Sequence, residues 1–144
     1  MPIYTLPYSE YQGPPSPAFA TGRLARRPVL RITLRNGNNH ISCYTIVDSG
    51  ADDCVFPRSF MQPLGLDPLT APTEMTSGVG NPSVATHYST VTIDLQGQMS
   101  FPVYAGFTTG MDHLGIGLLG QAGFFERFKI TFDYNNRLYV LETI

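Results

Sequence analysis

The sequence predicts an all-β fold built as a single domain of 144 residues. Its 14 glycines and 12 prolines interrupt regular structure often, as many short strands and tight turns require. Eight tyrosines and nine phenylalanines add side chains that favour a half-buried pleated surface. A chain of this length can bury one core of modest size and is too short for two domains.

The first 22 residues predict an N-terminal arm, and we expect the folded domain to span residues 23–144. The arm contains five prolines, which lack an amide hydrogen and hinder regular strand pairing. We therefore expect it to be extended or disordered. Tyr4, Tyr8 and Tyr11 could still anchor it on a folded surface.

The domain begins with two strands joined by a tight turn. Apolar residues at positions 29–34 predict the first strand, and the Asn-Gly-Asn-Asn segment at 36–39 predicts a hairpin turn. The return strand at 41–47 runs directly into Asp48.

Further hairpins and two short helices complete the predicted elements. Strands are expected on either side of a glycine-rich tip at 78–82, and the alternating apolar residues from Val91 to Leu95 predict another hairpin. Pro57 is expected to begin a short helix that ends at Gly65. The remaining expected elements are a brief helix at 122–128 and a closing hairpin of strands 129–133 and 137–141.

The chemically informative motif is Asp48-Ser49-Gly50-Ala51, at the end of an apolar strand. Alone the tripeptide is typical of a turn. Peptide hydrolysis without a metal or a covalent intermediate needs one carboxylate that takes a proton from water and a second carboxyl that polarises the scissile carbonyl. Two such carboxyls share a proton and titrate as a pair. Gly50 would let two copies of the backbone approach closely, and the Ser49 hydroxyl would bond between them.

Residues Asp48 to Asp53 resemble the active-site loop of the retroviral proteases. Leu118-Leu119-Gly120 is similar to the second signature of that family, two apolar residues and a glycine behind the catalytic loop, and the two segments lie about seventy residues apart. Residues 120–128 resemble those of bacterial retropepsin-like proteins. The similarity covers roughly residues 27–142.

The resemblance implies a retropepsin-like acid-protease fold with one or two short helices, and an aspartic endopeptidase that cleaves extended peptides. Only one Asp-Ser-Gly motif is present, so the second aspartate would come from another copy in a homodimer. The implied catalytic residues are Asp48, Ser49 and Gly50. The implied substrate-binding residues are Ala51 and Asp52 in the loop and Gly78, Val79 and Gly80 in a flap.

One position departs from the retroviral pattern. Where those proteases carry an arginine that braces the acid at the place of Asp52, this chain has Gln121. Hydrogen bonds alone, or Arg27 of the other subunit, would then brace Asp52. The departure also motivates an alternative hypothesis, a catalytically silent retropepsin-fold module for dimerisation or peptide binding.

Other chemistries find little support in the sequence. No two of His40, His87 and His113 have the spacing of metal ligands, and Cys43 and Cys54 lack that of a zinc site. We expect neither a metal nor another cofactor. A serine hydrolase is not indicated either, because the chain lacks the Gly-x-Ser-x-Gly elbow.

The expected partners are a peptide or protein substrate and a second copy of the chain. A net charge of −2 argues against nucleic acid, and no apolar run has the length needed to span a membrane. The polar, proline-rich start does not resemble a signal peptide, so a cytoplasmic location is expected.

Overall fold

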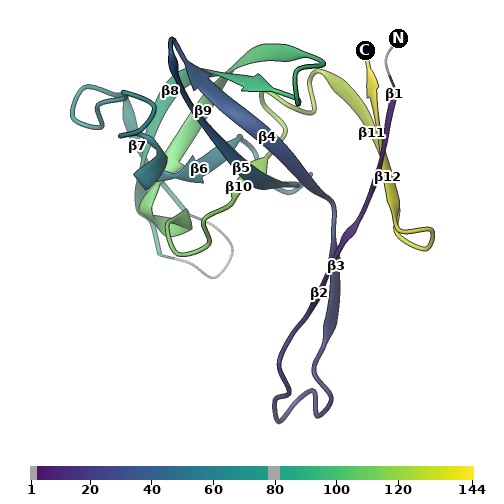
Figure 1. The fold of residues 1–144 in the computed structure, drawn as a ribbon. Coiled ribbons are helices and arrows are strands. Elements are labelled where there is room, and N and C mark those ends of the chain that lie inside the picture. The colour runs from purple at the N-terminus through teal and green to yellow at the C-terminus, as the bar shows by residue number, and fades with distance from the viewer. Residues whose placement is uncertain (1–2, 78–81) are drawn as a thin grey trace. The chain divides into compact units, whose positions relative to one another are not determined.

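The computed structural model describes residues 3–77 and 82–144 (Figure 1). Within these residues the chain forms mostly strands, which confirms the predicted all-β class. The elements are β1 (Ile3–Pro7), β2 (Ser9–Gln12), β3 (Leu24–Arg27), β4 (Val29–Asn36), β5 (Asn39–Val47), β6 (Val55–Pro57), η1 (Arg58–Phe60), β7 (Thr73–Thr76), β8 (Val84–Asp94), β9 (Ser100–Thr108), η2 (Thr109–Met111), β10 (Gly117–Leu119), β11 (Phe128–Asp133) and β12 (Leu138–Thr143), where η marks a 3₁₀ helix.

The chain divides into two compact units. The terminal unit consists of Met1–Val29 and Arg127–Ile144, and the central unit of Leu30–Glu126. Each is described below by itself.

The central unit is a seven-stranded sheet in the order β4-β5-β10-β6-β9-β8-β7. An additional pairing of β4 with β8 closes six of these strands into a ring, with β7 attached to β8 (Figure 1). Closure removes the edges of these six strands, and β7 remains as an edge strand. The longest ladder joins β8 to β9, from the pair Thr86–Thr108 to the pair Asp94–Ser100.

The core of the central unit follows from strand periodicity, since alternate side chains of a strand point to the same face. On β4 the alternate residues Leu30, Ile32 and Leu34 are all buried. The buried Thr45 is the polar exception, and its hydroxyl donates to the carbonyl oxygen of Leu30 at 2.6 Å. The other large side chains with almost no exposure in this unit are Phe56, Met61, Leu64, Ile93, Phe107, Leu119 and Phe124.

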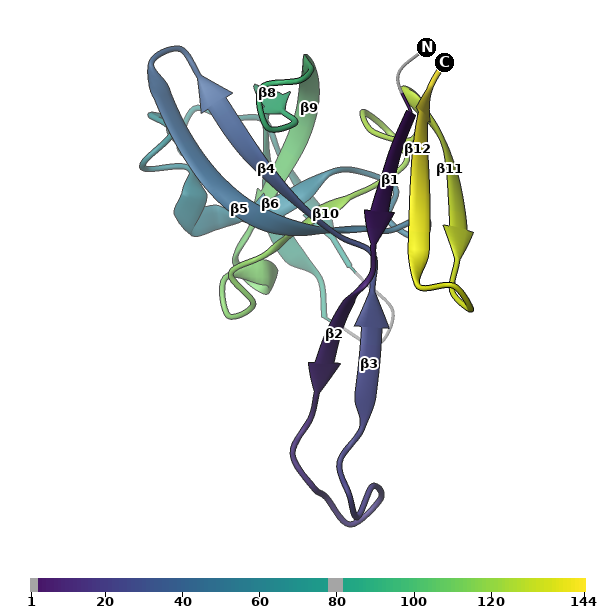
Figure 2. The same ribbon diagram turned by 45° about the vertical axis from the view of Figure 1, so that its right-hand side comes forward.

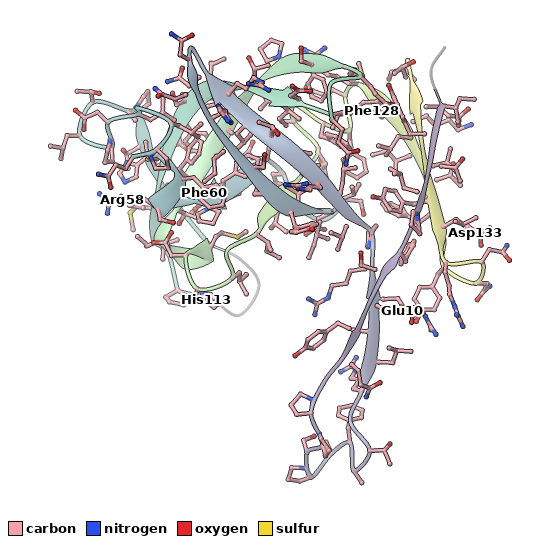
Figure 3. The ribbon with its side chains drawn as sticks, in the orientation of Figure 1. Glu10, Arg58, Phe60, His113, Phe128 and Asp133 are labelled. Atoms are coloured by element: carbon pink, nitrogen blue, oxygen red, sulfur yellow. The ribbon has the colours of Figure 1, made fainter. Side chains whose placement is uncertain are left out.

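The terminal unit holds a three-stranded antiparallel sheet in the order β1-β12-β11 (Figure 2). Tyr139 on β12 is fully buried, and its hydroxyl donates to the carbonyl oxygen of Val29. β2 and β3 form a separate hairpin. Glu10 on β2, labelled in Figure 3, pairs with Arg26 on β3 at 3.0 Å and with Arg137, just before β12, at 3.5 Å.

Residues 3–7 and 9–12 of the predicted N-terminal arm are therefore paired as strands. β1 bonds to β12 along its whole length, and Pro7 is tolerated because β1 is an edge strand of its sheet. A domain boundary at residue 22 stays a prediction.

The hairpins predicted around residues 36–39, 96–99 and 134–136 are confirmed. The helix predicted from Pro57 to residue 64 shortens to the single 3₁₀ turn η1, followed by turns up to Gly65, in agreement with the missing amide hydrogen of Pro63. The helix predicted at 122–128 is wrong. Gly123 has a φ of +96°, which no α-helix contains, so that segment forms turns.

Within residues 3–77 and 82–144, no helix is long and apolar enough to cross a membrane.

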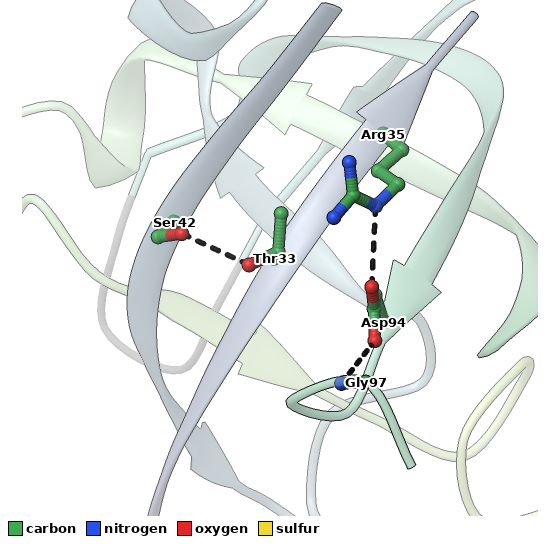
Figure 4. A network of polar contacts seen from close by, with 5 residues as sticks. All are labelled: Thr33, Arg35, Ser42, Asp94 and Gly97. Carbon is green, nitrogen blue, oxygen red and sulfur yellow. Dashed lines mark hydrogen bonds and ion pairs between the residues drawn. The ribbon is translucent and has the colours of Figure 1, made fainter. Parts of the chain in front are cut away.

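A small polar network lies where β4 meets β8 and the ring closes (Figure 4). Arg35 donates from Nε to Oδ2 of Asp94 at 3.2 Å, and the amide of Gly97 donates to Oδ1 at 2.8 Å. The hydroxyls of Thr33 and Ser42 bond at 2.9 Å between β4 and β5. The Gly97 amide first and Arg35 second lower the pKa of Asp94, because both interactions favour the ionised carboxylate.

We expect Asp94→Asn to destabilise the fold at neutral pH and to have a smaller effect in acid. Because the folded-state pKa of Asp94 is lowered, its contribution to stability is present above the unfolded-state pKa of about 3.9 and is lost as the pH falls through the folded-state value. Denaturant unfolding of both proteins, from about pH 7 to about pH 3, measures the difference. A difference that stays constant over this range would contradict the network's role.

Candidate active site

The candidate site is the loop of residues 48–53, here called the Asp48 loop, which follows β5 directly. Cys43, Thr45 and Val47 on β5 are buried and anchor this strand in the core. The amide of Asp48 donates to the carbonyl oxygen of Leu119 at 3.0 Å. Asp48 is therefore held by the anchored strand β5 before it and by β10 beside it.

Asp48 is half-buried, whereas Ser49 and Gly50 are exposed. The amide of Gly50 donates to Oδ1 of Asp48 at 2.9 Å, and the amide of Ala51 donates to the Asp48 carbonyl oxygen at 3.2 Å. Among the described residues, no other group bonds to the Asp48 carboxylate. One carboxylate oxygen is thus held by the loop itself, and the other accepts no hydrogen bond from the described residues.

The second signature lies directly beside the first, as the resemblance implied. In β10, Leu118 pairs in parallel with Ile46 and Leu119 with Val47. Leu118 also pairs with Val55 of β6, so β10 separates the strand before the loop from the strand after it. The two segments, far apart in sequence, form one support for Asp48.

Gly120 is required by the close approach of two backbones. A Cβ atom there would lie 2.5 Å from the carbonyl oxygen of Ala51 and closer still to that of Asp53. Because both obstacles are main-chain atoms, no rotamer change can relieve the overlap. The amides of Gln121 and Ala122 donate to the carbonyl oxygens of Ala51 and Asp52, both at 2.9 Å.

Gln121 acts differently from the arginine of the retroviral proteases. Its side-chain Nε2 donates to the carbonyl oxygen of Ser49 at 2.9 Å. Asp52 is exposed, and no side chain in residues 3–77 and 82–144 pairs with its carboxylate. The glutamine therefore braces the loop backbone next to Asp48 and leaves the acid at position 52 to water or to another molecule.

Asp53 has a partner that sequence reasoning missed. The hydroxyl of Tyr88, on β8, donates to Oδ2 of Asp53 at 3.0 Å. Burial first, and this bond second, raise the pKa of Tyr88 to about 12. No local sequence signal predicts the contact, because it joins positions 35 residues apart that only the sheet brings together.

The structure describes only part of the segment predicted to form a flap. Gly78, Val79 and Gly80 lie outside the described residues. The strands expected on either side are confirmed as β7 and β8, which pair from Thr73–His87 to Thr76–Val84.

Two further kinds of group bear on the chemistry, metal-ligating side chains and thiols. The described residues contain no group of three or more His, Cys, Asp or Glu side chains that could hold a metal ion. Cys43 and Cys54 are free and buried, and burial raises the pKa of their thiols to about 12 and about 11. Both thiols are therefore poor nucleophiles. A surface hollow lined by Arg58, Asp67 and Asp112, among others, contains no predicted site residue.

Comparison with known proteins agrees with this arrangement. A family model described as aspartyl protease matches residues 32–122, which include the whole Asp48 loop and the second signature. The chain belongs to the aspartyl protease family.

A solved structure of a retropepsin-like aspartic protease from Rickettsia conorii is similar, with a TM-score of 0.60 and 19% sequence identity. The similarity covers 98% of this chain and 99% of that protein. It confirms the predicted retropepsin-like fold. No curated protein matches the chain.

We expect Gly120→Ala to destabilise the protein by about 1–3 kcal/mol, the usual cost of overpacking a closed site. Gly110→Ala is the matched control, since its Cβ would meet only side-chain atoms at 3.5 Å or more, and we expect a change within about 0.5 kcal/mol. Denaturant unfolding of the two variants measures both values. Equal effects would show that the tight contact at Gly120 is not needed.

Proposed function

We propose that this member of the aspartyl protease family is an aspartic endopeptidase that acts as a homodimer, each subunit contributing Asp48. The observation that carries the proposal is the geometry of Asp48. It stands at the end of a buried strand, has one oxygen fixed by the Gly50 amide, and lies beside the exposed residues Ser49 and Gly50. A carboxylate on a rigid support suits general acid–base catalysis.

In the proposed reaction, two Asp48 carboxyls share one proton and hold one water molecule. The ionised carboxyl takes a proton from the water molecule, and the oxygen of that water bonds to the scissile carbonyl carbon. The protonated carboxyl gives its proton to the carbonyl oxygen, and a tetrahedral diol forms. The carboxyl that took the proton from water then gives it to the amide nitrogen, and the ionised carboxyl takes a proton from one diol hydroxyl as the C–N bond breaks. An acid and an amine leave, and the pair again holds one proton.

A second copy of the chain is required because one chain has too few catalytic motifs. The 144 residues contain a single Asp-Ser/Thr-Gly motif, so one chain supplies one carboxyl of the pair. Two identical loops facing each other require an isologous interface. The exposed backbone at Ser49 and Gly50 allows a close approach of this kind.

The proposed substrate is an extended peptide that lies along the loop as an added strand. Ala51 and the exposed Asp52 would contact it, and Gly78, Val79 and Gly80 would cover it as a flap. The expected cytoplasmic location also stays a prediction.

One observation favours the alternative of a catalytically silent peptide-binding module. Gln121 bonds the Ser49 carbonyl and does not brace Asp52, which the retroviral proteases hold with arginine. A peptide that carries a hydroxyl group in place of the scissile carbonyl separates the two hypotheses, because it mimics the tetrahedral intermediate. Tight binding with cleavage of a matched peptide supports the enzyme, and binding without any cleavage supports the module.

We expect Asp48→Asn to abolish cleavage of an unstructured protein substrate at mildly acidic pH while the protein stays folded. Asp67→Asn is the control, because Asp67 serves a surface turn in which its Oδ1 accepts from the Leu69 amide. Cleavage-product analysis and thermal unfolding of both variants give the result. Retained cleavage by the Asp48→Asn protein would overturn the assignment of Asp48.

Mixed dimers of wild-type and Asp48→Asn chains test whether two chains form one active site. When wild-type and Asp48→Asn chains exchange subunits, each mixed dimer has only one ionisable member of the pair and should be inactive. Activity should then follow the square of the wild-type fraction, and the specific activity of wild-type protein should fall on dilution. A linear dependence on the wild-type fraction would show that one chain suffices.

A further inference from the structure

A hydrogen bond from the hydroxyl of Tyr88 joins β8 to the second end of the Asp48 loop. It donates to Oδ2 of Asp53 at 3.0 Å in a part-buried position. β8 pairs with β7, β9 and β4, so the donor stands on a strand that is fixed along its length. A hydrogen bond from such a strand can hold a loop in one conformation.

The aromatic ring of Tyr88 is itself held in place. It stacks on the ring of Tyr104, with centroids 5.4 Å apart and planes inclined by 23°. Gly106 lies directly opposite on β9, where a Cβ atom would come within 2.7 Å of the Thr86 methyl group and 3.4 Å of the Tyr88 ring. A side chain at position 106 would therefore overlap the Thr86 methyl group and touch the Tyr88 ring.

The two ends of the Asp48 loop have separate supports. The first end is held by Leu119, which accepts from the Asp48 amide, and by Gln121, which bonds the carbonyl oxygens of Ser49 and Ala51. The second end is held by the Ala122 amide on the Asp52 carbonyl oxygen, by the bridge between Asp53 and Ala122, and by Tyr88. Loss of the Tyr88 bond should therefore loosen residues 52 and 53 and leave Asp48 in place.

We propose that Tyr88 is a positioning residue that, through Asp53, holds the Asp52–Asp53 end of the loop in the conformation that binds substrate. This inference rests on the proposed protease function. It assigns to Tyr88 an effect on substrate binding and none on the chemical step at Asp48.

The chemistry of the pair suits this role. A neutral phenol that donates to a carboxylate makes a charge-assisted hydrogen bond, which is stronger than one between two neutral groups. Because burial raises the pKa of Tyr88 to about 12, the hydroxyl keeps its proton in neutral and acidic solution and stays a donor. The phenol therefore remains a donor throughout the pH range expected for the protease.

The test compares Tyr88→Phe with Tyr104→Phe. The first change removes the bonded hydroxyl and keeps the ring, and the second removes a neighbouring hydroxyl from a half-exposed ring and keeps the stacking. We expect Tyr88→Phe to raise KM about tenfold, the size of effect typical of a lost hydrogen bond to a charged group, with kcat within about twofold. Tyr104→Phe should change neither constant more than about twofold.

A merely structural role for Tyr88 would give a different pattern. Partial unfolding lowers kcat, because fewer molecules are active, and leaves KM unchanged. Asp53→Ala adds a second criterion, since the Tyr88→Phe/Asp53→Ala double variant should have the same KM as Asp53→Ala alone. A lower kcat at constant KM, or additive effects in the double variant, would overturn the proposal.

Amide hydrogen exchange keeps the test independent of turnover. The Ala122 amide, bonded to the Asp52 carbonyl oxygen, should exchange about tenfold faster in Tyr88→Phe than in Tyr104→Phe. If the wild type cleaves no peptide, the proposed function fails, yet this measurement still decides whether Tyr88 holds the loop. Equal exchange rates at Ala122 in the two variants would overturn the role of Tyr88.

Discussion

The candidate site depends on one close approach, in which the backbone after β10 lies directly against the backbone of the Asp48 loop. The amides of Asp48, Gln121 and Ala122 all take part in hydrogen bonds between these two segments. Main-chain segments can come this close only where no Cβ atom stands between them, and Gly120 meets that condition. The position of the carboxylate, and with it the proposed chemistry, follows from this contact.

The contacts described for the loop all lie within residues 30–126, the central unit. β10 supports the loop through the main chain, Gln121 through its side chain, and β8 through Tyr88. A second copy of the chain would therefore have to supply a carboxyl group but not the order of the loop. Each chain therefore orders its own Asp48 loop on folding, and dimer formation would only bring two such loops together.

The three carboxylates of the loop have three different environments. Asp48 accepts from a backbone amide within its own turn, Asp53 accepts from a tyrosine on a neighbouring strand, and Asp52 is exposed. Partial burial removes water from a carboxylate, and a hydrogen-bond donor offsets this loss. The two partly buried acids, Asp48 and Asp53, each have such a donor. Asp52 is exposed and keeps its hydration. These differences support separate roles for chemistry, positioning and recognition.

Local patterns in the sequence determined most of the strands and the place of the site. Apolar residues predicted β4, and β5 was predicted as the return strand that runs into Asp48. Turn residues predicted the hairpins, and the motif at Asp48, with the resemblance of Leu118-Leu119-Gly120 to a family signature, identified the two segments that the fold brings together. Such features depend on a few neighbouring residues. The tertiary structure alone decided the closure of β4 on β8, the failure of the helix at 122–128, the bond of Gln121 to Ser49 and the contact of Tyr88 with Asp53. Each of these depends on atoms distant in sequence or on a backbone angle set by packing, and no local pattern contains that information.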